Sequence, residues 1–67
     1  MSEYTLNGQA QAWREGLSVA ALLAELERAP DAVATALNGA FLPRGRREAT
    51  LIQPGDALTL IQPITGG

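Results

Sequence analysis

The sequence has 67 residues and a net charge of −2, with neither cysteine nor histidine. This length allows one small domain with a marginal core, and the missing residue types exclude disulfides, Cys/His metal sites, thiol nucleophiles and histidine acid–base chemistry. The mild charge argues against a general nucleic-acid binder, and without a membrane-spanning run or an apparent signal peptide we expect a cytoplasmic protein with no membrane partner.

The first segment, residues 3–14, is typical of a β-hairpin. Its Asn7-Gly8 dipeptide suits a two-residue turn, because both residues tolerate a positive φ. Tyr4 and Leu6 fall on one face of the first strand. We interpret Trp13, in the second strand of this hairpin, as a lid over an edge of the core, and a partner-binding hot spot is the alternative.

A helix is predicted to follow, with Ser18 as its N-cap. Four apolar residues then recur at i, i+3, i+4 and i+7, which forms one helical stripe. They are Val19, Leu22, Leu23 and Leu26. Pro30 cannot continue a helix, so we predict that the helix ends near Arg28 or Ala29. The stripe is interpreted as part of the core.

The middle segment, "AVATALNGAFLPR", predicts a second pair of strands. Residues 32–37 are apolar on both faces apart from Thr35, which is typical of a strand in the interior of a sheet. Asn38-Gly39 repeats the turn dipeptide, and a short strand is expected to run through Leu42. Pro43 then ends the pairing or marks an edge of the sheet.

Residues 45–56 are predicted to be irregular, with one helical turn and a tight turn at Pro54-Gly55-Asp56. The last strand starts at position 57, with leucines 58 and 60 on one face. Its other face carries Ala57, Thr59 and Ile61. Together these elements predict an α+β domain of two layers, in which one mixed sheet packs one face on a single helix and leaves its other face open.

Few groups inside this domain could perform catalysis, and we expect that the chain is not an enzyme. There is no P-loop signature, only carboxylates could hold a metal, and no metal site is predicted. Arg44, Arg46 and Arg47 form the one local cluster of charge. The cluster is interpreted either as a solvated loop or as an electrostatic contact with an acidic partner.

The chain ends "PITGG", and this ending suggests a reactive group. Gly66 and Gly67 have no Cβ, so their backbone can enter a channel too narrow for a side chain. Residues 63–67 could extend about 16–18 Å from the last strand. The terminal carboxylate is ionised at neutral pH and reacts only after activation. The pattern predicts a carrier protein whose reactive atom lies at its own C-terminus.

The sequence resembles the ThiS family, the sulfur carrier proteins of thiamine biosynthesis, over nearly its whole length. The resemblance rests on "LNG" at the first turn, "G-x-SVAALL" entering the helix, "ALNGAFLPR", "PGD" before the last strand, and the final "GG". It implies the ubiquitin-like β-grasp fold, as one domain over residues 1–67 with four to five strands, one main helix and a flexible reactive tail at residues 63–67.

The resemblance also implies a function. Gly67 would be adenylated by an ATP- and Mg-dependent enzyme of the ubiquitin-activating type, and the persulfide of a cysteine desulfurase or an equivalent donor would convert it to a thiocarboxylate. The thiocarboxylate would pass its sulfur to thiazole synthase. Gly66 would provide clearance for the tail, and the domain itself would bind no cofactor.

Partner binding is expected on the open face of the sheet near the tail. The candidate residues are Ile61, Pro63, Ile64 and Arg44. One departure from the family concerns the loop after Pro43-Arg44, where the family often has an aromatic residue and this chain has Arg46 and Arg47.

Three alternatives stay open at this point. The small subunit of molybdopterin synthase shares the fold, the Gly-Gly ending and the thiocarboxylate. A protein modifier would form isopeptide bonds with its targets, and a plain binding module would have a tail without function.

Overall fold

The computed structural model describes residues 2–62, and within them the chain forms a mixed five-stranded sheet, one α-helix and two short 3₁₀ helices. In chain order the elements are β1 (Glu3–Leu6), β2 (Gln9–Ala12), α1 (Val19–Glu25), η1 (Pro30–Ala32), β3 (Ala34–Leu37), β4 (Ala40–Leu42), η2 (Arg44–Arg46) and β5 (Ala57–Ile61). The strands lie in the order β2-β1-β5-β3-β4. Only β1 and β5 are parallel; the other three pairs are antiparallel.

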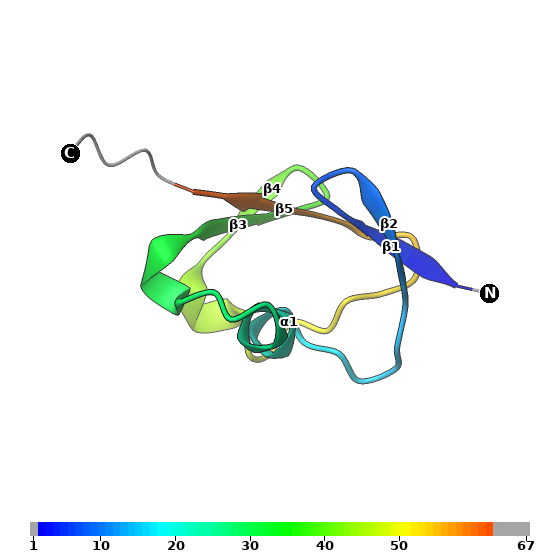
Figure 1. Ribbon diagram of the computed structural model, residues 1–67, viewed down its shortest axis with the longest axis horizontal. Helices are drawn as coiled ribbons and strands as arrows, with labels where there is room; N and C mark the ends of the chain where they lie inside the picture. The colour runs from blue at the N-terminus through cyan, green and yellow to red at the C-terminus, as the bar shows by residue number, and fades with distance from the viewer. Residues whose placement is uncertain (1, 63–67) are drawn as a thin grey trace.

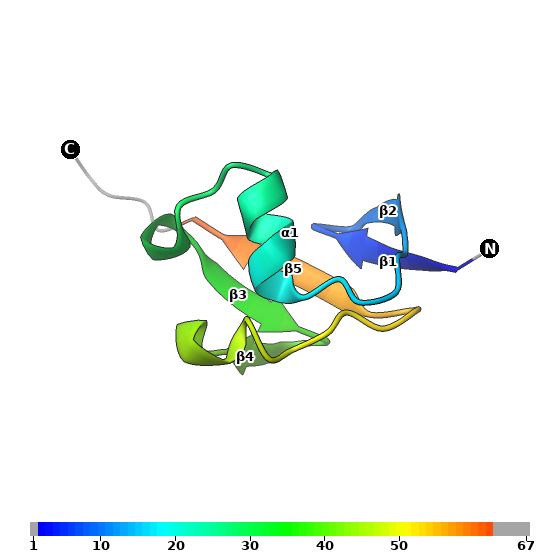
Figure 2. The same ribbon diagram turned by 90° about the horizontal axis from the view of Figure 1, so that it is seen from below.

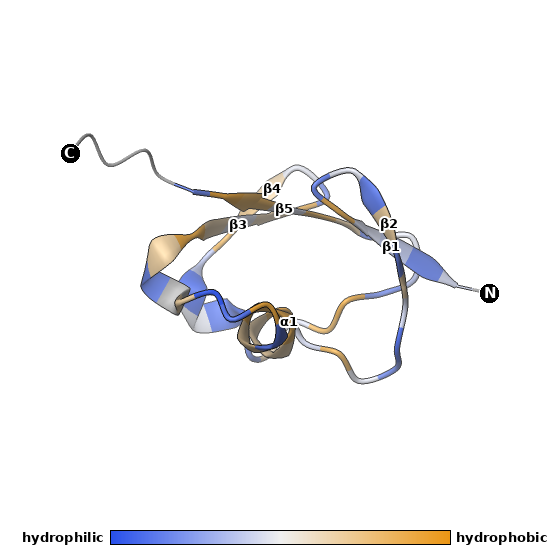
Figure 3. Ribbon diagram, viewed as in Figure 1, coloured by the Kyte–Doolittle hydropathy of each residue, from blue (hydrophilic) through white to orange (hydrophobic). Residues whose placement is uncertain are grey.

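The molecule has two layers, with α1 on one face of the sheet (Figures 1 and 2). The core lies between the layers, where Val19, Leu22, Ile52 and Leu58 are each at most 5% exposed and pack in one cluster. Apolar segments of the sheet and of α1 face one another in Figure 3. This is the two-layer α+β arrangement predicted from the sequence, and it is the ubiquitin-like β-grasp fold that the resemblance implies.

Both Asn-Gly dipeptides form the predicted turns. Asn7 and Gly8 have φ values of 51° and 84°, and Asn38 and Gly39 have values of 52° and 82°. Two successive residues with positive φ match the right-handed twist of the flanking strands. The β1–β2 and β3–β4 hairpins therefore follow from local sequence.

The helix begins as predicted but ends earlier. The Ser18 side chain accepts a hydrogen bond of 3.0 Å from the Ala21 N–H, as an N-cap should. The last helical residue is Glu25 rather than Arg28 or Ala29, because Glu27 adopts a φ of +57°. The N–H groups of Glu27 and Arg28 then bond back to Ala24 and Leu23, in the pattern of a Schellman motif.

This early end changes the prediction for two neighbouring segments. Leu26 is 39% exposed and is not part of the buried stripe. The strand predicted at residues 32–37 begins only at Ala34, because Pro30–Ala32 forms η1. Pro30 lies in the first turn of η1, where an N–H would have no partner within the helix, so its missing N–H costs nothing. Strand β3 does lie in the interior of the sheet, between β5 and β4, as its apolar sequence predicts.

Two side chains anchor the long connection between β4 and β5. The Trp13 indole N–H donates to the Ile52 carbonyl at 2.7 Å, and Trp13 packs against the core cluster, which confirms the lid interpretation. Arg47 is only 4% exposed and donates to the Val33 carbonyl at 2.7 Å and to Thr35 Oγ1 at 3.1 Å. The connection is therefore held on the helix side of the sheet although most of it has no regular structure.

Candidate functional site

One face of the sheet is turned away from α1 and is not covered by any described element (Figure 1). We call it the outer face. The pairing registers bring small or apolar side chains together on it from β1, β3, β4 and β5, which include Thr5, Ala36, Phe41, Ala57, Thr59 and Ile61. None of these six residues is charged. Glu3 shares the face but lies at the start of β1.

Two large apolar side chains stand out on the outer face. Phe41 is 69% exposed and Ile61 is 51% exposed. Ala36 lies between Phe41 and Thr59, since it pairs with both, and Ile61 is the next outward-facing residue of β5. The small residues between them leave a low apolar surface on which a partner could pack closely.

Ile61 is where the sequence predicts it, on the face opposite Leu58 and Leu60. Its role in partner binding stays a prediction. Phe41 was missed by sequence reasoning, but the signal was present. A two-residue turn at Asn38-Gly39 fixes the pair Leu37–Ala40, so the next residue, Phe41, must lie opposite Ala36 on the outer face.

The arginine cluster does not act as one surface. Arg44 lies in η2 with its side chain 62% exposed and forms an ion pair with Asp31 of η1. Arg46 is also exposed. Arg47 points into the molecule and is buried. The sequence-based interpretation of the cluster, as a solvated loop or as a partner contact, is therefore wrong for Arg47. Arg44 remains a surface candidate at the same end of the sheet as Ile61, because β4 ends opposite the start of β3.

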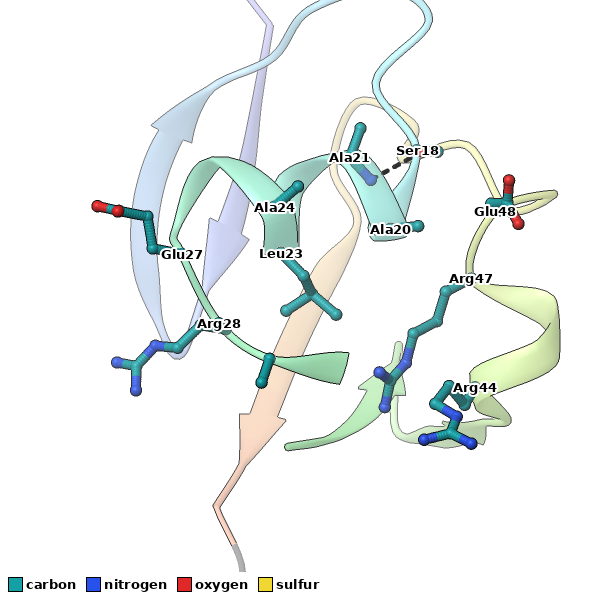
Figure 4. Close-up of a pocket in the computed structure, with 11 residues that line it drawn as sticks. Ser18, Ala20, Ala21, Leu23, Ala24, Glu27, Arg28, Arg44, Arg47 and Glu48 are labelled. Atoms are coloured by element: carbon teal, nitrogen blue, oxygen red, sulfur yellow. Dashed lines mark hydrogen bonds between the residues drawn. The ribbon is translucent and has the colours of Figure 1, made fainter. Parts of the chain in front are cut away.

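A groove also lies on the opposite side of the molecule, between α1 and η2 (Figure 4). Its walls include Ala20, Ala21, Ala24 and Leu23, with Arg28 and Glu27 on one side and Arg44 and Arg47 on the other. The Ser18 hydroxyl in this groove already caps the helix. Among residues 2–62 no three Asp, Glu, His or Cys side chains form a metal-binding group.

The remaining predicted site residues lie outside the described part of the chain. They are Pro63, Ile64, Gly66 and Gly67, which follow β5 in the sequence. The connection is direct, since Ile61 ends β5 and only Gln62 separates it from Pro63. Within residues 2–62, no helix has the length and apolar character needed to cross a membrane.

Comparison with known proteins gives four findings. The sequence model of the ThiS family matches residues 2–67. The crystal structure of a thiamine biosynthesis protein (ThiS) from Geobacter metallireducens superposes with a TM-score of 0.80 at 32% identity, covering 97% of this chain and 99% of that one. A solution NMR structure of a thiamine biosynthesis protein from the same organism superposes with a TM-score of 0.75 at 33% identity. This match covers 100% of this chain and 88% of that one. None of the curated proteins matches the sequence significantly.

Proposed function

This chain belongs to the ThiS family, and we propose from that membership that it is a sulfur carrier protein of thiamine biosynthesis. The observation that carries the proposal is the family match, which extends over residues 2–67 and so includes the Gly-Gly ending. The similarity to thiamine biosynthesis proteins along nearly their full length favours this pathway over that of molybdopterin synthase. A carrier of this kind acts in the cytoplasm, as a co-substrate of other enzymes.

The chemistry is assigned to the terminal carboxylate of Gly67. An adenylating enzyme that binds ATP and Mg²⁺ joins this carboxylate to AMP and releases pyrophosphate. The outer sulfur of a cysteine desulfurase persulfide, or of an equivalent donor, then attacks the carbonyl and displaces AMP, which gives an acyl disulfide. A thiol of the partner enzymes or a thiol reductant cleaves the S–S bond, so that the thiocarboxylate is released and a disulfide is left behind. Thiazole synthase accepts the sulfur. The body of the domain does not interfere, because the sequence has no cysteine thiol and no lysine amine that could attack the activated carbonyl.

The outer face is proposed as the surface that the adenylating enzyme grips. Its exposed apolar residues Phe41 and Ile61 give a partner two anchors. Ile61 is followed after one residue by Pro63 and Ile64, so a partner seated here would hold the body close to the start of the tail. Arg44, exposed at the same end of the sheet, would meet an acidic group at the rim of that contact.

The proposal is tested by intact-mass spectrometry after incubation with the adenylating enzyme, ATP and a sulfur donor. We expect a mass gain equal to the exchange of one oxygen for sulfur, located at the C-terminal peptide. A variant without Gly66 and Gly67 is the matched control and should fold normally without gaining mass. A ladder of conjugates with other proteins would instead identify a modifier, and growth without thiamine on the shortened variant would identify a tail without function.

A further inference from the structure

Strand β5 is held near each end by the side chain of an asparagine from a different hairpin turn. At its start, Asn38 Oδ1 accepts a hydrogen bond of 2.9 Å from the Ala57 N–H. Near its other end, Asn7 Oδ1 accepts a hydrogen bond of 2.8 Å from the Leu60 N–H. In each case the asparagine has a positive φ and opens an Asn-Gly turn. Each of these two asparagines therefore has two roles. Its backbone adopts the conformation that the turn requires, and its side chain holds β5.

The contact of Asn7 lies where the parallel pairing of β1 with β5 stops. The Asn7 N–H still donates to the Leu58 carbonyl at 2.9 Å, which continues the ladder by one bond. The register itself ends at the pair Leu6–Leu58, because at Asn7 the backbone bends into the turn. Beyond that pair, the side-chain carbonyl of Asn7 accepts the Leu60 N–H. Only Oδ1 can accept this N–H, so the amide orientation is fixed by its partner.

Beyond this point β5 runs on past the β1–β2 turn (Figures 1 and 2). On the other side of β5, the pairing with β3 continues to Ile61, which lies opposite Ala34. On the β1 side, the Asn7 bond is the last one that holds β5 within the described residues. Asn7 also borders a small hollow together with Arg28, Val33, Leu60 and Gln62, so it lies directly at the base of the tail.

We propose that Asn7 is a positioning residue for the tail, which rests on the carrier function proposed above. Its side-chain oxygen fixes the Leu60 peptide on the side that β1 leaves open, and so limits the directions in which the chain leaves the sheet at Gln62. A tail that leaves in one direction loses less conformational entropy when its carboxylate enters the site of the adenylating enzyme. Asn7 acts through β5 and touches no reacting atom.

The test separates this role from the role of Asn7 in the turn. Asn7→Gly keeps the turn, because glycine adopts positive φ freely, and removes only the acceptor. Asn7→Asp keeps an acceptor oxygen and tolerates the same backbone conformation. Asn38→Gly is the control at the end of β5 far from the tail, since it also keeps a turn and removes an acceptor from β5, together with the bond that Asn38 Nδ2 donates to Asp56 Oδ1. The readout is kcat/KM for pyrophosphate release with the adenylating enzyme of the same organism and ATP.

We expect Asn7→Gly to lower kcat/KM about tenfold. Without the acceptor roughly one more backbone residue is free, and it must be fixed again when the tail binds the adenylating enzyme. Asn7→Asp should restore most of the activity, and Asn38→Gly should stay close to wild type. The proposal is overturned if Asn7→Gly behaves as wild type, if both glycine variants lose activity equally, or if Asn7→Asp is as weak as Asn7→Gly.

Amide hydrogen exchange adds a measurement that needs no enzyme. In Asn7→Gly the Leu60 amide should exchange about 3- to 10-fold faster than in wild type, because its acceptor is gone. The Ala57 amide should respond in the same way to Asn38→Gly only. A wild-type chain that is never adenylated refutes the carrier function and with it the positioning role, whereas unchanged Leu60 exchange in Asn7→Gly refutes the hydrogen bond on which the inference stands.

Discussion

Replacement of Arg47 by alanine should destabilise the domain severely, although the sequence places this residue in a run of surface arginines. The guanidinium is buried and donates to the Val33 carbonyl at 2.7 Å and to Thr35 Oγ1 at 3.1 Å. A hydrogen bond from a charged donor contributes about 1.5–3 kcal/mol, so two such bonds give roughly 3–6 kcal/mol. Water entering the vacated space would offset part of this, and we expect a loss of about 3 kcal/mol in the free energy of unfolding.

That loss is large for this chain. A domain of 67 residues has a total stability of roughly 3–10 kcal/mol. The melting temperature should fall by about 12–24 °C, because each kcal/mol shifts it by about 4–8 °C in domains of this size. Thermal unfolding and urea unfolding, followed by circular dichroism, measure both quantities.

Three variants make the test specific. Arg46→Ala is the control, because Arg46 is exposed and its removal should change stability by less than about 0.5 kcal/mol. Arg47→Met keeps most of the apolar stem and should still lose the hydrogen-bond contribution. Arg47→Lys keeps a charge but not the forked donors, so it should fall between Arg47→Met and wild type. If Arg47→Ala proves as stable as Arg46→Ala, the anchoring role assigned to the buried guanidinium is wrong.

Three further predictions concern the helix end, the core lid and the outer face. Glu27→Gly should raise the free energy of unfolding by about 1 kcal/mol in urea titrations, because a left-handed conformation is costly for any residue with a Cβ; a lower stability would contradict this. Trp13→Phe should cost about 1–3 kcal/mol, since the Ile52 carbonyl loses its donor, and an unchanged urea midpoint would show that the indole N–H contributes nothing. Ile61→Asp should leave the circular dichroism spectrum intact and weaken binding to the adenylating enzyme roughly tenfold in calorimetry; unchanged affinity would exclude Ile61 from the docking surface.

Much of the local structure could be predicted because its causes are local. Asn-Gly dipeptides fix both hairpin turns, Ser18 caps the helix, and the alternation in β5 assigns Ile61 to the face opposite Leu58. These features depend on residues only a few positions apart. The same local rules misplaced the end of the helix. Pro30 is a strong stop signal, but Glu27 had already closed the helix in a conformation that sequence patterns associate with glycine.

The contacts that could not be predicted join distant parts of the chain. Burial of Arg47 requires that residues 43–51 fold back against β3, where the Val33 carbonyl and the Thr35 hydroxyl are available. The bond from Leu60 to Asn7 spans 53 positions and exists only because β1 and β5 are parallel. A single sequence gives charge and periodicity, but it does not give the registers that bring such groups together.

The position of β5 has a consequence for the biosynthesis of the protein. Among the described elements β5 comes last in the chain, yet it lies between β1 and β3 and unites the two hairpins into one sheet. A product of premature termination before residue 57 would keep α1 and both hairpins but lack the strand that joins the hairpins, and isolated hairpins are at best marginally stable. The outer face therefore forms only after the residues of β5 have been synthesised.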